Sequence, residues 1–329
     1  MSEFGALSSL DGATVLVTGA TGSFGRRFIA RALRETKLGK LIVFSRDELK
    51  QHELRGAYPD EPRLRFFLGD VRDKDRLMRA FAGVEIVVHA AALKQIPAAE
   101  YNPFEFVKTN VVGAQNLIDA AIDCGVRRVV ALSTDKASSP VNLYGATKLV
   151  SDKLFVAGNV YAGSGPTRFA VVRYGNVIGS RGSVIPVFRE LAKSGRIPVT
   201  DLGMTRFWIT LDQGVDLVLH ALHDMQGGEI YVPKIPSMRV VDLAKAIAPD
   251  AAIEVVGIRP GEKLHEEMIS PSDARRTFDR GPYFVVLSEL ALEAAREERG
   301  APVANGFHYT SDENSEWLDV PHLRELADA

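Results

Sequence analysis

The feature that most constrains the fold is a regular alternation between short apolar runs and longer amphipathic stretches. Runs rich in β-branched residues occupy residues 14–18, 40–45, 64–68, 85–89, 128–133 and 168–173. Between these runs the apolar residues recur at helical spacing, as in residues 25–34. Because strands that are apolar along their whole length must be covered on both faces, the pattern predicts an α/β fold with a doubly wound parallel sheet.

The rhythm changes after about residue 176, which predicts a second and smaller part of the chain. Proline and glycine become frequent there and the apolar runs shorten. We predict that residues 10–178 form the large domain and that the chain rejoins its sheet at about residues 209–235. Residues 179–208 and 236–329 are then expected to form a smaller, mainly C-terminal domain.

The composition excludes several classes of function. The chain is 46% apolar and 25% charged, with a net charge of −2, so it has no strong field for nucleic acid or an anionic membrane. Cys124 is the only cysteine, which excludes an internal disulfide and favours the cytoplasm. No apolar run approaches the roughly 18 residues that a membrane span needs. We expect a cytoplasmic protein that binds neither nucleic acid nor membrane.

A glycine-rich segment, residues 18–25, follows the first predicted strand and opens the first predicted helix. Gly19 permits a tight turn, Gly22 lets the backbone approach a pyrophosphate, and Gly25 lets helix and strand pack closely. An ordinary strand-to-helix turn is the alternative. The position of the glycines between an apolar strand and an amphipathic helix favours a dinucleotide site in a Rossmann domain, which is the large domain of residues 10–178. The residues expected to line the loop are Gly19, Thr21, Gly22, Ser23, Phe24 and Gly25.

The end of the second predicted strand indicates which dinucleotide binds. An NAD site usually has a carboxylate there to hold the ribose 2′-hydroxyl, whereas this strand ends in Ser45 and Arg46. A hydroxyl and a guanidinium suit the 2′-phosphate of NADP, because arginine can donate two hydrogen bonds to it. Asp47 is the contrary observation, unless it caps the following helix. We predict NADP as the cofactor.

Two further segments are placed to contact the dinucleotide. Asp70 and Val71 follow the third strand and are expected near the adenine. Ala90 and Ala92 follow the fourth strand and leave room beside the nicotinamide ribose. Simple packing would explain either segment as well.

A set of polar residues lies where open α/β sheets place their chemistry, at the carboxyl end of the fifth strand. Thr134, Asp135 and Lys136 end that strand, and Tyr144 and Lys148 follow with a spacing that puts both on one helix face. A tyrosine can remove a hydroxyl proton if a nearby ammonium stabilises its phenolate. The pair alone occurs by chance in many helices, but together with the glycine loop it predicts hydride transfer from a carbinol.

Over nearly the whole chain, these motifs resemble the extended short-chain dehydrogenases/reductases. Sugar-nucleotide dehydratases of that family ordinarily have an Asp-Glu pair beside the threonine, where this chain has Asp135 and Lys136. The string 133–148 closely resembles the inverting UDP-N-acetylglucosamine 4,6-dehydratases of pseudaminic acid biosynthesis. Membrane-anchored and capsule-type relatives are similar but have methionine at the position of Tyr144.

The resemblance implies a lyase reaction that gives UDP-2-acetamido-2,6-dideoxy-β-L-arabino-hex-4-ulose, the first step toward pseudaminic acid for glycoconjugates or flagellin. Tyr144 would take the proton of the 4-hydroxyl while NADP⁺ accepts hydride from C4. Lys136, as a neutral amine, would remove the C5 hydrogen, and protonated Asp135 would release the 6-hydroxyl as water. Hydride would return to C6, and C5 would be reprotonated from the opposite face. We expect a neutral Lys136 because Lys148 and the oxidised nicotinamide disfavour another positive charge.

Substrate contacts are expected from residues that follow the strands and from three arginines. The resemblance places Lys94 and Asn176 beside the sugar nucleotide, although a solvated loop lysine would explain Lys94 equally well. A diphosphate needs cations, and several arginines together make an anion pocket. The candidates are Arg181, Arg206 and Arg259, with Glu262 in the same family-like string as Arg259.

Other functions fit the residues less well. The histidines lack the spacing of metal ligands, so no metal is expected, and the resemblance implies a homo-oligomer. A UDP-sugar 4-epimerase would keep Tyr144 and Lys148 but would have no use for Asp135 and Lys136. A non-catalytic NADP-binding protein would need neither Tyr144 and Lys148 nor Asp135 and Lys136.

Overall fold

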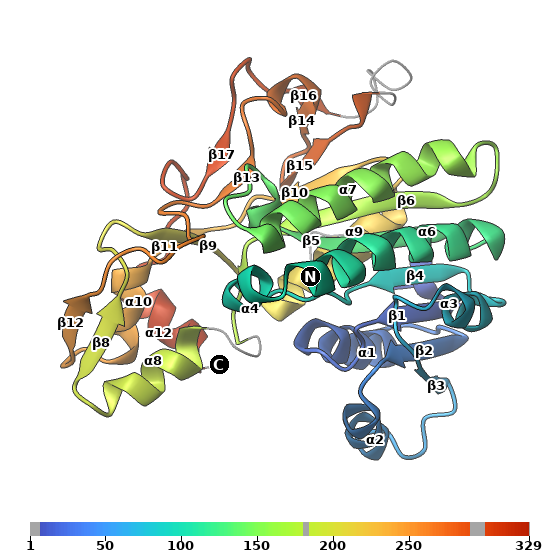
Figure 1. Ribbon diagram of the computed structural model, residues 1–329, viewed down its shortest axis with the longest axis horizontal. Coiled ribbons are helices and arrows are strands. Elements are labelled where there is room, and N and C mark those ends of the chain that lie inside the picture. The colour runs from blue at the N-terminus through green and yellow to red at the C-terminus, as the bar shows by residue number, and fades with distance from the viewer. Residues whose placement is uncertain (1–6, 180–183, 290–299, 329) are drawn as a thin grey trace.

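A ten-stranded sheet forms the centre of the protein, and seven of its strands are parallel (Figure 1). The structure, a computed structural model, describes residues 7–179, 184–289 and 300–328. The parallel strands run in the order β3-β2-β1-β4-β5-β6-β10. Their bounds are β1 Thr14–Thr18, β2 Lys40–Ser45, β3 Leu64–Leu68, β4 Ile86–His89, β5 Arg128–Thr134, β6 Arg168–Tyr174 and β10 Ile230–Pro233. The predicted doubly wound sheet is therefore confirmed, and its strand order reverses between β1 and β4, where such folds bind ligands.

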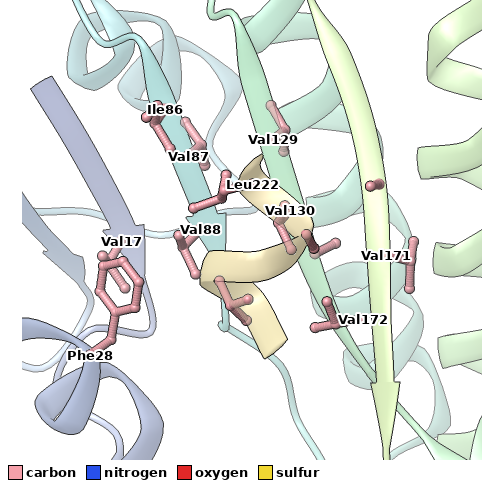
Figure 2. Packing of buried hydrophobic residues seen from close by; sticks show 14 of the residues in the cluster. Val17, Phe28, Ile86, Val87, Val88, Val129, Val130, Val171, Val172 and Leu222 are labelled. Atoms are coloured by element: carbon pink, nitrogen blue, oxygen red, sulfur yellow. The ribbon is translucent and has the colours of Figure 1, made fainter. Parts of the chain in front are cut away.

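Helices cover both faces of this sheet. On one face α1 (Ser23–Glu35) contacts α9 (Leu211–Asp224), and on the other α6 (Gly113–Asp123) lies between α3 (Lys74–Phe81) and α7 (Leu143–Ala162). Figure 2 shows Phe28 of α1 beside Val17, and Leu222 of α9 over the strands that carry Val88 and Val130. The remaining elements of this part are η1 Leu7–Leu10, α2 Glu48–Gly56, α4 Ile96–Tyr101, α5 Pro103–Phe106, the π-helix η2 Val107–Val112 and the 3-10 helix η3 Asp135–Ala137.

A smaller part lies beside the carboxyl ends of the parallel strands, at the left of Figure 1. It has its own apolar core, in which Phe188, Trp208, Leu243 and Leu323 are buried. Two small sheets and three helices build it. They are β8 Arg196–Val199 with β12 Ala252–Val255, then β7 Asn176–Val177, β9 Thr205–Ile209 and β11 Ser237–Arg239, and the helices α8 Val184–Ala192, α10 Val240–Ile247 and α12 Val320–Asp328.

The C-terminal third differs from the expected division of the chain. We assigned residues 236–329 to the smaller domain, whereas three strands within this range extend the large sheet beyond β10 as antiparallel neighbours. These strands have only two to four residues each, too few to show a period in the sequence. They are β14 Thr277–Asp279, β15 Tyr283–Val286 and β16 Ala301–Pro302, preceded by η4 Ala274–Arg276. Nearby, β13 Glu267–Ile269 pairs with β17 Tyr309–Thr310.

None of the helices in the described ranges is long and apolar enough to cross a membrane.

Candidate active site

The glycine loop makes the close backbone approaches that the sequence predicts. Gly19 has a positive φ of 63°, and a Cβ atom there would lie 2.8 Å from the backbone of Ala90. A Cβ atom on Gly25 would lie 2.5 Å from the backbone of Ala20, so only glycine lets α1 begin this close to β1. Gly22 is the N-cap of α1 and no side chain caps the helix. The N-terminus of a helix, with its N–H groups and positive dipole end, suits an anion.

A cavity of about 660 Å³ extends from this loop across the carboxyl ends of the parallel strands. It brings together most residues that the sequence analysis singled out. On the cofactor side the lining includes Gly19, Thr21, Gly22, Ser23, Phe24, Gly25, Ser45, Arg46, Val71, Ala90 and Ala92. On the other side it includes Lys94, Thr134, Lys136, Tyr144, Lys148 and Asn176.

The end of β2 presents a hydroxyl and a guanidinium to this cavity. The Ser45 hydroxyl accepts a hydrogen bond from Gln51 Nε2 at 3.1 Å, and the Arg46 side chain is half exposed. Asp47 caps α2, accepting from the N–H of Lys50 at 3.0 Å, which confirms the capping role, but Asp47 also lines the cavity, so the cap does not exclude a ribose contact. Lys50 also lines the cavity, a contact that the sequence analysis missed. Its position three residues after the cap could have indicated it.

Asp70 does not line the cavity, contrary to the expected adenine contact. Its carboxylate forms ion pairs with Arg72 at 2.7 Å and with Arg46 at 3.6 Å. Burial alone would raise the pKa of Asp70, but these two arginines outweigh it and hold the pKa below its ordinary value. Asp70 therefore orients Arg46, and its neighbour Val71 provides the cavity wall.

Helix α7 places Tyr144 and Lys148 on the cavity wall. Asn142 caps the helix, accepting from the N–H of Gly145 at 2.8 Å. The buried Lys148 ammonium donates to the carbonyl oxygen of Leu132 at 2.9 Å, and burial lowers its pKa. Burial raises the pKa of Tyr144 to about 12, although the positive charge of Lys136 opposes this shift.

At the end of β5, three polar groups converge around Lys136. Its Nζ lies 3.1 Å from Asp135 Oδ1 and 3.1 Å from Glu266 Oε1, and Thr134 Oγ1 donates to Asp135 Oδ1 at 2.8 Å. Asp135 is fully buried, and burial raises the pKa of its carboxyl group, although Lys136 opposes that rise. The shift is in the direction of the protonated Asp135 that the sequence analysis expects, but the contact with Lys136 at 3.1 Å favours the ionised form.

The expected neutral state of Lys136 is wrong for the arrangement observed. Burial by itself lowers the pKa of Lys136, but the carboxylates of Asp135 and Glu266 outweigh burial, so the pKa is raised above its ordinary value. The sequence analysis weighed only the positive groups around Lys136. It missed Glu266, which comes from the segment just before β13, far along the chain. The pair Glu266-Glu267 close to the family-like string 259–263 was the available signal.

The substrate-side predictions divide into two groups. Lys94 and Asn176 line the cavity, and Asn176 Oδ1 is buried and accepts no hydrogen bond from the described residues. Arg206 does not line it, because its Nε lies 3.6 Å from Glu266 and its NH1 donates to the carbonyl oxygens of Thr205 and Leu264. Arg259, mostly exposed and paired with Glu262 at 3.9 Å, is not on the wall either. Arg181 lies outside the described residues.

No group of three or more histidine, cysteine, aspartate or glutamate residues within the described ranges could hold a metal ion. The strand order, the glycine loop and the arrangement of Thr134, Tyr144 and Lys148 instead define the extended short-chain dehydrogenase/reductase class. Residues 15–288 match the family described as polysaccharide biosynthesis protein, and the chain belongs to this family.

Two relatives of known name are similar to this chain over most of its length. A Campylobacter jejuni protein (subsp. jejuni serotype O:2) is 51% identical over 322 residues, which cover 95% of this chain and 96% of the relative, and is named UDP-N-acetylglucosamine 4,6-dehydratase (inverting). A Rickettsia akari protein named UDP-glucose 4-epimerase is 42% identical over 324 residues, covering 95% of this chain and 94% of its own.

Solved structures share the fold over most of the chain. Pen from Bacillus thuringiensis has a TM-score of 0.88 at 36% identity, covering 96% of this chain and 98% of its own. DesIV, a dTDP-glucose 4,6-dehydratase from Streptomyces venezuelae solved with NAD bound, has a TM-score of 0.69 at 28% identity, covering 76% and 86%.

Proposed function

We propose that the protein is an NADP-dependent UDP-N-acetylglucosamine 4,6-dehydratase that inverts the sugar at C5. The observation that carries this proposal is the contact of Lys136, which lines the cavity beside Tyr144, with the fully buried Asp135 behind the cavity wall. Oxidation at C4 needs only the tyrosine and Lys148, whereas loss of water across C5 and C6 needs a further acid and base. The relative named as an inverting dehydratase, at 51% identity, supports the same assignment.

The residues around the glycine loop fit a nicotinamide dinucleotide. The first turn of α1 has no side-chain cap, and Gly19 and Gly22 let a pyrophosphate approach the helix N-terminus closely. Ser45 and Arg46 would hold the 2′-phosphate of NADP, with Asp70 orienting the guanidinium. When bound, the cofactor accepts a hydride at the start of the reaction and returns it at the end.

Tyr144 is the group that moves the first proton. With a pKa of about 12, it is a phenol at neutral pH, so it needs nearby positive charge to act as a base. Lys148 supplies part of that charge from one turn further along α7, where the Leu132 carbonyl oxygen holds its ammonium. Tyr144 Oη then takes the proton of the substrate's 4-hydroxyl.

Asp135 and Lys136 serve the water loss. Asp135, whose pKa burial raises, would give a proton to the 6-hydroxyl as it leaves, and because the carboxyl group is fully buried behind the cavity wall, the substrate would have to approach it closely. Lys136, which reaches the cavity wall, must first lose its extra proton and can then remove the hydrogen at C5. Asn176 Oδ1 is free to accept a hydrogen bond from the sugar nucleotide.

The test is incubation of the purified protein with UDP-N-acetylglucosamine and NADP⁺, followed by mass spectrometry and NMR. A product lighter by one water and inverted at C5 is expected. The rival is a UDP-sugar 4-epimerase, which the name of the Rickettsia relative favours. A product of unchanged mass, with only C4 inverted, would establish the epimerase and exclude the dehydratase.

The pathway, the cellular location and the oligomeric state of the enzyme follow from the same proposal. The product would enter pseudaminic acid biosynthesis in the cytoplasm. The enzyme would act as a homo-oligomer, and exposed apolar side chains on α4 and α5, Tyr101 and Phe104, are candidates for covering by a second copy. Light scattering coupled to gel filtration gives the mass of the assembly and tests this point.

A further inference from the structure

Glu266 is a buried carboxylate of the charged cluster around Lys136, and the proposed reaction gives it no role. Its Oε1 lies 3.1 Å from Lys136 Nζ and 3.6 Å from Arg206 Nε. The residue is 2% exposed, and its Oε2 has no hydrogen-bond partner among the described residues. A buried carboxylate is costly without partners, so its position is set by the charges that it faces.

Two hydrogen bonds to Ser311 hold the backbone of Glu266 in place. Its N–H donates to Ser311 Oγ at 2.8 Å, and its carbonyl oxygen accepts from the N–H of Ser311 at 2.8 Å. The hydroxyl of Ser311 in turn lies 2.7 Å from that of Thr205, on β9. The C-terminal segment and β9 therefore hold this carboxylate against Lys136, which belongs to the end of the large sheet.

We propose that Glu266 is a positioning residue that keeps Lys136 charged and oriented in the resting enzyme and so sets the pH at which Lys136 can act as a base. The inference rests on the proposed function for its chemical meaning, but the contact itself does not. Glu266 lies 3.1 Å from Lys136 Nζ, and although burial alone would raise its pKa, positive charge, mainly that of Lys136, outweighs burial and lowers it. The smaller part of the molecule thereby controls a side chain carried by the large sheet.

The charged and titratable groups around Lys136 come from several elements. Two carboxyl groups favour its charge and three cations disfavour it, while Tyr144 on α7 faces it from the cavity. The carboxyl groups are those of Asp135 and Glu266, and the cations are Arg206, Lys94 and Lys263. Each of the two carboxyl groups has an oxygen 3.1 Å from Lys136 Nζ.

The test compares Glu266→Gln with Glu267→Gln. Glu267 is a matched control, because its carboxylate accepts from the hydroxyls of Ser138 and Ser139 at 2.6 Å and makes no ion pair with Lys136. Acetic anhydride labelling of Lys136, followed by peptide mass spectrometry across a pH series, gives the midpoint at which its amine becomes reactive. Glu266→Gln should lower this midpoint by about 1 to 3 pH units, the effect of removing a nearby opposite charge. Glu267→Gln should keep the wild-type midpoint.

An equal midpoint in wild type and Glu266→Gln would overturn the proposal. If Glu266→Gln does not fold, Glu266→Asp replaces it, because aspartate keeps the charge but places it farther from Lys136 Nζ. The labelling midpoint of Glu266→Asp should then fall between that of wild type and the ordinary lysine value. A labelling midpoint equal to that of wild type in Glu266→Asp would also contradict the proposal. The rate of water loss from UDP-N-acetylglucosamine is measured on the same proteins, and its acidic limb should shift with the labelling midpoint. A labelling shift without any water loss in wild type would reject the proposed function and leave the role of Glu266 intact.

Discussion

A Cβ atom on Gly145 would lie 2.2 Å from the backbone carbonyl oxygen of Lys136. Helix α7, which carries Tyr144 and Lys148, therefore packs directly on the 3-10 turn that carries Asp135 and Lys136. The pair Tyr144 and Lys148 and the pair Asp135 and Lys136 can therefore lie this close only because residue 145 has no side chain. No flexible side chain is present at this contact to move aside.

Gly145→Ala should separate these two elements. Overpacking of this kind costs about 1–3 kcal/mol of stability, and the displaced Lys136 and Tyr144 should lose most of their activity. Gly56→Ala is the matched control, since a Cβ at this glycine near the end of α2 meets nothing within 4 Å. Denaturant unfolding and turnover are the measurements. Wild-type turnover in Gly145→Ala would show that this contact does not position the site.

A buried ion pair behind the site should dominate the stability of α7 on the sheet. Arg173 and Asp152 lie 3.1 Å apart, both almost fully buried, and Ser133 Oγ donates to the same carboxylate at 2.8 Å. Asp152→Ala leaves a buried guanidinium without its carboxylate, which typically costs about 3–5 kcal/mol in the free energy of unfolding. Glu190→Ala removes the exposed pair with Lys193 and should leave the unfolding midpoint almost unchanged. Equal effects of the two changes would contradict this ranking.

The cofactor prediction concerns Arg46. The protein should bind NADP more tightly than NAD in calorimetry, and Arg46→Asp should reverse the preference because it replaces a phosphate-binding cation with a ribose-binding carboxylate. Arg72→Ala is the control, since Arg72 pairs with the same Asp70 but does not line the cavity. Equal affinities of the wild-type protein for NAD and NADP would reject NADP as the preferred cofactor.

The parallel strands β1 to β6 were predictable from the sequence because their runs are largely apolar and because amphipathic helices such as α1 and α3 separate them. The cavity-lining residues from Gly19 to Lys148 were predictable for a related reason: parallel strands bring their carboxyl ends to one edge. The charge on Lys136 was not predictable, because it depends in part on Glu266, and the order of residues in the sequence gives no indication of that contact. Strands as short as β16, with two residues, carry no period at all.

The hydride should leave C4 and return to C6 within one active site, so the reaction should consume no external oxidant or reductant. With trace NADP⁺, product should accumulate far beyond one equivalent of cofactor. Tyr144→Phe should stop the reaction, because the hydroxyl that takes the first proton is gone. Product that stops at one equivalent would identify a net dehydrogenase instead.

The sharpest prediction concerns Lys136→Met. If this side chain removes the hydrogen at C5, the variant should lose water-forming activity by about 10²–10⁴-fold, the usual contribution of a general base. Binding of NADP and oxidation at C4 should survive because Tyr144 and Lys148 remain in place, although oxidation should be slower without the Lys136 charge that lowers the pKa of Tyr144 against the effect of burial. Lys153→Met is the control: Lys153 is an exposed lysine on the same helix as Lys148. In deuterated water the wild-type product should carry deuterium at C5, while C6 receives the hydrogen that left C4. A Lys136→Met variant that dehydrates at near wild-type rate would assign the base to another residue, and the contact between Asp135 and Lys136 would no longer support inverting dehydration.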